Sequence, residues 1–212
     1  MLQKGAACCR MSDFAAALLA GGHSRRMGTD KAFLQWQGRP LWEHQLEKLR
    51  ALAPSRLLLS CRAEQEIPAL ADVQRVHDEW ENSGPLGGVA SCLHACEAPR
   101  LVVLGVDLPH LPAEFLRTLL AQSTDECGAA VRVADYYEPL AAVYPRAMLA
   151  LAEEQLSAGR LAMQDFIRRG VERGLMRCMD LPSPRAWFSN WNTPEDVSPD
   201  APAGDASPAS WH

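Results

Sequence analysis

The feature that most constrains this chain is an alternation of short, wholly apolar runs with longer amphipathic stretches. Residues 14–20 are all apolar and stop at a pair of glycines, and residues 101–106 have almost the same character. Such runs, bounded by turn residues, are typical of strands buried on both faces of a parallel sheet. Between them, apolar residues recur at helical spacing. The pattern predicts an α/β protein with a three-layer α/β/α Rossmann-like fold and a mostly parallel central sheet.

The same reasoning gives the expected order of elements. We expect strands at 14–20, 56–61, 74–77, 101–106, 128–134 and 139–144. We expect helices from Pro40, at 86–96, from Pro112, and near 146–156 and 161–170. Ligands of such folds bind in the crevice at the carboxyl ends of the parallel strands. One folded domain is expected at 13–197, with residues 1–12 and the proline-rich residues 198–212 disordered.

Charge and composition exclude several classes of protein. The chain has 21 Lys plus Arg against 26 Asp plus Glu, a formal net charge of −5. A mildly acidic chain has no general attraction for nucleic acid, and no apolar run approaches the roughly 20 residues that cross a bilayer. The first residues lack the apolar stretch of a secretory signal, so we expect a cytoplasmic protein. The seven cysteines contain no CxxC pair, which indicates small buried residues in a reducing compartment.

The most informative segment is residues 19–31, LAGGHSRRMGTDK, which directly follows the first expected strand. Its glycines permit close backbone approach, and the backbone N–H groups of such a loop can form a nest for anions. Arg25, Arg26 and Lys31 add cations that suit a polyphosphate. The segment matches neither a Walker A loop nor a G-x-G-x-x-G fingerprint. A solvated basic turn is the alternative interpretation.

Two aspartates follow expected strands at the same edge of the sheet. Asp107 ends the most apolar strand, so its carboxylate is expected in the crevice, where hard oxygen ligands hold Mg²⁺. The alternative is an ordinary turn or capping aspartate before Pro109. Asp78 follows the strand at 74–77, and a surface acid in a turn would explain it nearly as well. Asp30 is expected to order its loop by pairing with an arginine.

These segments together resemble a known family. The pattern L-A-G-G-x-S-x-R-M-G-x-D-K resembles the signature loop of the nucleotidyltransferases that activate sugars and cofactors with a nucleoside triphosphate. Four further segments, in the family's order, narrow the resemblance to the molybdenum cofactor guanylyltransferases: SGPLGG at 83–88, VDLP at 106–109, EPLAAVY at 138–144 and NWNTPED at 190–196. The resemblance covers residues 14–197. It implies transfer of GMP from GTP to the molybdenum–pterin cofactor, with release of pyrophosphate.

The resemblance also implies roles for the residues that match the family's motifs. The implied catalytic residues are Lys31, Arg26 and Asp107, with Mg²⁺ as cofactor on Asp107. The implied GTP-binding residues are Leu19, Ala20, Gly21, Gly22, Lys31, Asp78, Gly84, Pro85 and Asp107. The implied pterin-binding residues are Asn190 and Asn192, whose amides offer both donors and acceptors. Ser60 stands where the family often has asparagine.

The implied partners are GTP and a molybdopterin-type cofactor, with handover of the product to molybdoenzymes or their chaperones and no role for nucleic acid or membranes. Two alternatives remain at this point. One is a related nucleotidyltransferase that uses CTP or acts on another phosphorylated acceptor. The other is a catalytically silent protein that binds a nucleotide or the cofactor.

Overall fold

A computed structural model describes residues 13–21, 30–80, 82–181 and 186–188 of the chain. The main sheet runs in the order β10-β7-β9-β6-β1-β4-β5, and β8 pairs with β7. Its strands are β1 (Phe14–Leu19), β4 (Arg56–Ser60), β5 (Val73–Val76), β6 (Arg100–Gly105), β7 (Gly128–Val133), β8 (Tyr136–Tyr137), β9 (Ala141–Pro145) and β10 (Met176–Leu181). The principal helices are α1 (Leu41–Arg50), α2 (Gly84–Ala95), α3 (Ala113–Gln122), α4 (Met148–Ser157) and α5 (Met163–Glu172). A small hairpin, β2 (Gln35–Trp36) and β3 (Arg39–Pro40), and two short 3₁₀ helices, η1 (Lys31–Phe33) and η2 (Ala186–Phe188), complete the described residues.

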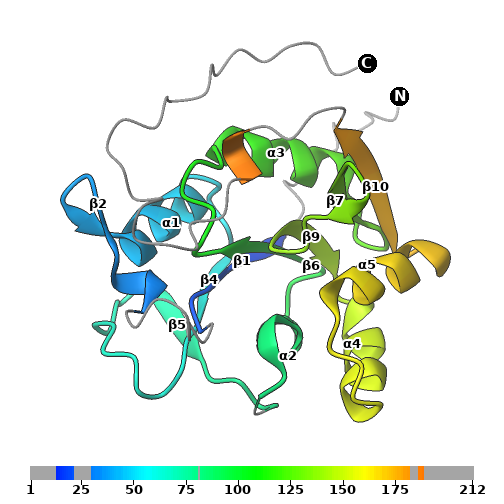
Figure 1. Ribbon diagram of the computed structural model, residues 1–212, viewed down its shortest axis with the longest axis horizontal. Coiled ribbons are helices and arrows are strands. Elements are labelled where there is room, and N and C mark those ends of the chain that lie inside the picture. Colours follow the sequence, from blue (N-terminus) through cyan, green and yellow to red (C-terminus); the bar gives the residue numbers. More distant parts are fainter. Residues whose placement is uncertain (1–12, 22–29, 81, 182–185, 189–212) are drawn as a thin grey trace, which may run out of the picture.

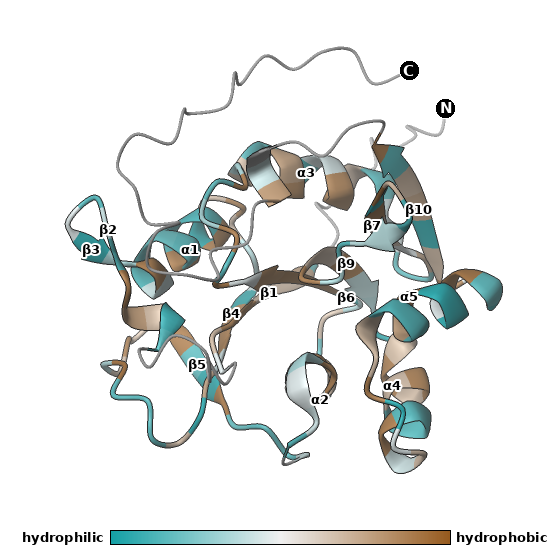
Figure 2. Cartoon of the chain, viewed as in Figure 1, coloured by the Kyte–Doolittle hydropathy of each residue, from teal (hydrophilic) through white to brown (hydrophobic). Residues whose placement is uncertain are grey.

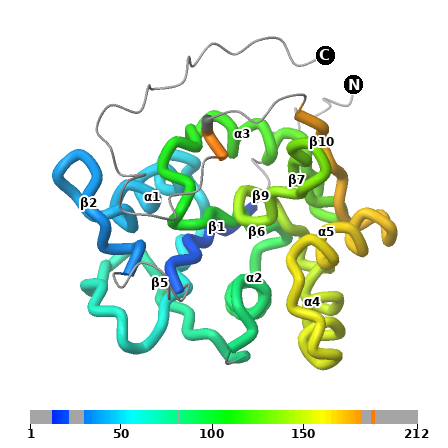
Figure 3. The backbone as a smooth tube through the Cα atoms, viewed as in Figure 1, coloured from blue at the N-terminus to red at the C-terminus, as the bar shows by residue number. Residues whose placement is uncertain are grey.

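The sheet separates two helical layers, as Figures 1 and 3 show. Helices α1 and α3 cover one face, and α2, α4 and α5 cover the other. In β1, Ala16 and Leu18 belong to the first core while Ala15 and Ala17 belong to the second, and all four are fully buried. The hydrophobic colouring of the central strands in Figure 2 follows from this two-sided burial. The three-layer prediction is confirmed.

The strands are mostly parallel, with one reversal. β1 is parallel to both β4 and β6, β4 to β5, and β10 to β7. β9 is antiparallel to both of its neighbours, β6 and β7. The chain turns back through the short strand β8 before β9, so no crossover helix separates β7 from β9. Within the described residues, no helix has the length and apolar character needed to span a membrane.

Several expected boundaries and elements need correction. Pro40 and Pro112 are N-caps, so α1 and α3 begin one residue later than predicted. β9 begins at Ala141 rather than 139, and α4 and α5 each begin two residues later than expected. β10 is absent from the predicted strands. It lies at the edge of the sheet, where Arg177 and Asp180 are exposed, so its sequence, MRCMDL, is not a continuous apolar run.

The cysteine prediction is confirmed in part. Cys61, Cys92 and Cys96 are buried, Cys127 and Cys178 are half-buried, and all five are free thiols. Residues 1–12 and 198–212 lie outside the described residues.

Candidate active site

Four parallel strands deliver their carboxyl ends to one edge of the sheet. In spatial order these are β5, β4, β1 and β6, followed along the chain by Asp78, Cys61, Ala20 and Asp107 respectively. Backbone bonds continue to the edge: the Ala20 amide donates to the Ser60 carbonyl at 2.8 Å, and the Val106 amide to the Leu19 carbonyl at 3.1 Å. The predicted site residues Ala20, Asp78 and Asp107 therefore lie along the same edge of the sheet.

Asp107 lies just beyond β6, where its carboxylate packs on the backbone of Gly105. A Cβ at Gly105 would come within 2.7 Å of Asp107 Oδ1 and 3.0 Å of Leu140 Cβ, so this position has no room for a side chain. Burial raises the pKa of the half-buried Asp107 carboxyl, and the charge of Lys31 acts in the opposite direction. The charge of the predicted loop lysine therefore acts on the predicted carboxylate.

The Lys31 backbone is fixed by Asp30. One Asp30 carboxylate oxygen accepts a hydrogen bond from the Ala32 amide at 3.0 Å and caps η1. The other accepts from Arg62 Nη2 at 2.7 Å and from Gln65 Nε2 at 2.8 Å. The predicted pairing of Asp30 with an arginine is confirmed.

Gln65 joins the two ends of the signature loop and was not anticipated. Its side-chain nitrogen also donates to the Ala20 carbonyl at 2.9 Å, and the residue is only 4% exposed. It therefore ties the residue after β1 to Asp30 at the far end of the loop. No motif marks this glutamine in the sequence.

At the other end of the edge, Asp78 packs against the glycines that begin α2. A Cβ at Gly87 would lie 2.6 and 2.8 Å from the two Asp78 carboxylate oxygens, and one at Gly88 would lie 3.0 Å from Ser60 Oγ. Asp78 accepts a hydrogen bond from the Trp80 amide at 3.0 Å, and burial raises the pKa of its carboxyl. These glycines are therefore required for the helix to approach both strand ends.

The start of α2 is open to solvent. Gly84 and Pro85, at the first positions of the helix, are both exposed. Gly84 has a φ of +60°, which an L side chain rarely adopts. The backbone around these two residues is accessible to a ligand lying along the edge beside Asp78.

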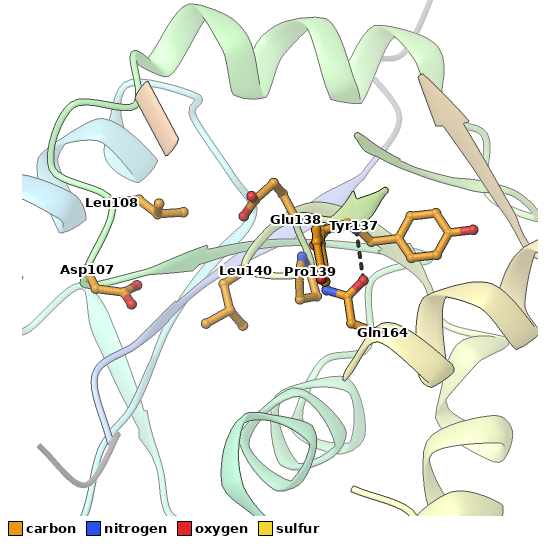
Figure 4. Close-up of a pocket in the computed structure, with 8 residues that line it drawn as sticks. Asp107, Leu108, Tyr137, Glu138, Pro139, Leu140 and Gln164 are labelled. Carbon is orange, nitrogen blue, oxygen red and sulfur yellow. Dashed lines mark hydrogen bonds between the residues drawn. The ribbon is translucent and has the colours of Figure 1, made fainter. Parts of the chain in front are cut away.

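A pocket of about 240 Å³ lies beside Asp107 (Figure 4). It is formed partly by the residues before β9, the strand that flanks β6 on the side away from β5 and Asp78. Its lining residues come from the end of β6, the β8–β9 turn and the start of α5: Asp107, Leu108, Tyr136, Tyr137, Glu138, Pro139, Leu140 and Gln164. Burial, together with the charge of Asp107, raises the pKa of Glu138 to about 7. Two carboxyl groups therefore share this pocket.

Hydrogen bonds from Gln164, Tyr144 and Gly105 hold the β8–β9 turn in place. Gln164 and the Tyr137 backbone exchange two hydrogen bonds of 2.8 Å each (Figure 4). The Tyr144 hydroxyl donates to the Pro139 carbonyl at 2.7 Å, and the Gly105 amide donates to the Leu140 carbonyl at 2.7 Å. The sequence segment 138–144 marks Glu138 as part of a family motif without indicating its role, and no motif marks Gln164.

Four of the predicted site residues, Gly22, Arg26, Asn190 and Asn192, lie outside the described residues. Among the residues that are described, no group of three or more His, Cys, Asp or Glu side chains could hold a metal ion.

The sequence is similar to one known family and to named relatives over most of its length. The family described as "MobA-like NTP transferase domain" matches residues 16–173. A probable molybdenum cofactor guanylyltransferase of Opitutus terrae is 42% identical, over 87% of this chain and 93% of that protein. A molybdenum cofactor guanylyltransferase of Pseudomonas putida is 33% identical, over 84% and 92%.

Solved structures agree with these matches. Molybdopterin-guanine dinucleotide biosynthesis protein A of Archaeoglobus fulgidus has a TM-score of 0.69 at 25% identity, covering 86% of this chain and 94% of that one. A 2-C-methyl-D-erythritol 4-phosphate cytidylyltransferase of Thermus thermophilus has a TM-score of 0.64 at 17% identity, covering 85% and 94%, and shares the fold.

Proposed function

The chain belongs to the MobA-like NTP transferase family, and from this premise we propose that it transfers GMP from GTP to the molybdenum–pterin cofactor and releases pyrophosphate. The relatives named molybdenum cofactor guanylyltransferase match nearly their whole length. The observation that carries the proposal is where Lys31 and Asp107 lie along the carboxyl-end edge of the sheet. The glycine-lined region at Asp78 is on one side of them, and the pocket at Glu138 is on the other.

This order along the edge matches the order of groups in the reacting pair. The nucleoside would lie against the exposed start of α2 and Asp78, where glycine backbone leaves room for a flat ring. The triphosphate would lie along Leu19, Ala20 and the signature loop. The acceptor would enter from the pocket beside Glu138, so that its terminal phosphate meets the α-phosphorus near Asp107.

In the reaction, an oxygen of the acceptor's terminal phosphate attacks the α-phosphorus of GTP in line. A new phosphorus–oxygen bond forms, the bond between the α-phosphorus and the bridging oxygen breaks, and pyrophosphate leaves with that electron pair. Negative charge grows on the transferred group and the leaving group, and we propose that the Lys31 ammonium, whose charge acts on Asp107, stabilises it. Because the phosphates react directly, the main tasks of the protein are alignment and electrostatics.

The Asp107 carboxylate fits a divalent cation, which we propose is Mg²⁺. Mg²⁺ binds one or two protein carboxylates and fills its remaining positions with phosphate oxygens and water, so a single carboxylate beside a triphosphate is sufficient. A cation there would neutralise charge on the triphosphate. We propose that Arg26 contacts the phosphates of GTP. We propose that Asn190 and Asn192 contact the pterin. We also propose a cytoplasmic reaction whose product passes to molybdoenzymes or their chaperones.

The test is product identity. The protein is incubated with the molybdenum cofactor, Mg²⁺ and each nucleoside triphosphate in turn, and the product is identified by mass. A guanine dinucleotide formed from GTP is expected. A cytosine dinucleotide formed preferentially from CTP would overturn the choice of nucleotide, and a folded protein that binds GTP without turnover would overturn the assignment as an enzyme.

The metal role of Asp107 is tested by Asp107→Asn. The amide keeps the shape of the side chain but is a poorer ligand for a hard cation, so the variant should need more Mg²⁺ and turn over more slowly at saturating GTP. Activity is titrated against Mg²⁺ alongside a melting curve. A lower melting temperature with an unchanged Mg²⁺ requirement would show that Asp107 only stabilises the turn.

A further inference from the structure

Helix α1 contacts the segment that carries Asp107 through two side chains one turn apart. Gln45 Nε2 donates to the Gly105 carbonyl at 3.0 Å. Lys48 Nζ donates to the Pro109 carbonyl. Gly105 and Pro109 lie two residues before and two residues after Asp107, so α1 holds both ends of this five-residue segment.

The two contacts act on different parts of the segment. Gly105 is also held by the sheet, through its own amide and the Leu140 carbonyl. Val106 is still bonded to the sheet, because its amide donates a hydrogen bond to the Leu19 carbonyl. Lys48 therefore secures the part of the segment that has left the sheet.

Both side chains are costly to bury. Gln45 is fully buried, and its Oε1 has no hydrogen-bond partner among the described residues, which lowers the stability of the fold. Burial lowers the pKa of Lys48 to about 8, which shows that its charge is poorly solvated. A methionine at either position would pack without these penalties. Their presence therefore points to a role other than stability.

The small hairpin β2–β3 covers the lysine. The Trp36 ring centroid lies 5.7 Å from Lys48 Nζ, and His44 Nε2 bonds the Trp36 carbonyl at 2.6 Å. Trp36 also meets the His110 ring edge-on, with centroids 5.7 Å apart. Trp36 of the hairpin and His110, the residue after Pro109, therefore lie near Lys48 and limit the access of water to it.

We infer that Gln45 and Lys48 are positioning residues that fix the Asp107 carboxylate and so set how strongly the enzyme couples metal binding to nucleotide binding. The inference rests on the proposed function, because it takes Asp107 as the carboxylate that meets the metal–GTP complex. Both residues act through backbone carbonyls rather than on the substrate. Loosening either bond would let the carboxylate drift from the position the metal requires, and supporting residues of this kind typically change metal affinity roughly 10- to 100-fold.

The experiment measures metal coupling directly. GTP binding to the full-length protein is measured by calorimetry with and without Mg²⁺, and the ratio of the two dissociation constants is the coupling. We expect Gln45→Met and Lys48→Met each to reduce this ratio roughly tenfold and to lower kcat more than they raise KM. Glu43→Ala is the matched control: Glu43 lies on the same helix, is partly exposed and takes no part in the bonds to Gly105 and Pro109, so its variant should keep the wild-type ratio.

Asp107→Asn, measured in parallel, separates the inference from the proposed function. Loss of coupling in Asp107→Asn together with reduced coupling in the two methionine variants supports the inference. Loss in Asp107→Asn with a wild-type ratio in both methionine variants overturns the positioning role and leaves the proposed function intact. Full coupling in Asp107→Asn overturns the metal role of Asp107, and the inference with it. Melting curves identify any variant that fails to fold, in which case the other methionine variant decides.

Discussion

Glu138 should make the protein less stable as the pH rises toward neutrality. Its carboxyl is half-buried, and burial and the charge of Asp107 raise its pKa from 4.5 to about 7. Between these two values the folded state keeps a proton that the unfolded state has released. The folded state therefore binds more protons in this window, and the free energy of unfolding falls as pH increases through it.

The size of the effect follows from the two pKa values. A rise from 4.5 to about 7 corresponds to at most about 3.5 kcal/mol, since each factor of ten in proton affinity is worth ~1.4 kcal/mol. The side chain is partly exposed, and screening by water reduces this to about 1.5 kcal/mol. Glu138→Gln cannot titrate, so it should escape the loss.

The assay compares wild type and Glu138→Gln by urea unfolding at pH 5 and pH 8.5. The variant should gain about 1.5 kcal/mol over wild type between the two pH values, equivalent to roughly 3–6 °C in melting temperature. Glu153→Gln, on the exposed side of α4, is the control and should show no such gain. A stability difference between Glu138→Gln and wild type that stays the same at both pH values would refute the placement of this carboxyl beside Asp107.

Three further substitutions test the two ends and the centre of the site. Lys31→Ala should lower turnover roughly 10²- to 10³-fold with little change in melting temperature, because it removes one fixed charge donor, and wild-type turnover would refute its role. Gly87→Ala places a methyl group against the Asp78 carboxylate, so KM for GTP should rise about tenfold, consistent with the ~1–3 kcal/mol cost of overpacking; an unchanged KM would place the nucleoside elsewhere. Gln164→Leu removes both bonds to Tyr137 and should lower the free energy of unfolding by about 1–3 kcal/mol while leaving KM for GTP unchanged; an unaltered unfolding curve would show that the β8–β9 turn does not need this anchor.

The parts of the fold that could be predicted are those with two-sided burial. β1 and β6 are buried on both faces, so their sequences are continuous apolar runs, and the residues after them could be assigned to one crevice. β10 is an edge strand that mixes buried and exposed positions, and its sequence has no comparable signal. Sequence periodicity therefore located the centre of the sheet, whereas of its two margins it located β5, expected at 74–77, but not β10.

Three glutamines in and around the site could not have been predicted, for a shared physical reason. Gln45, Gln65 and Gln164 each bond a backbone carbonyl that is distant in sequence, those of Gly105, Ala20 and Tyr137. Every residue has a backbone carbonyl, so such a pairing leaves no trace in the sequence at the accepting position. Asp107 could be predicted because it follows the most apolar strand, and Lys31 because it belongs to the glycine-containing basic loop after the first strand.

The reversed direction of β9 divides the site between two lengths of chain. Because β9 runs against β6, it begins at the edge where the parallel strands end, and the turn at 138–140 reaches the pocket from the start of a strand. The nucleotide end and Asp107 are complete by residue 109, whereas this turn comes later in the chain, between β8 and β9, which both run antiparallel to β7. Under the proposed function the two substrates are therefore held by separate lengths of chain. A change at residues 136–140 can alter the choice of acceptor while the strand ends that hold the nucleotide stay the same.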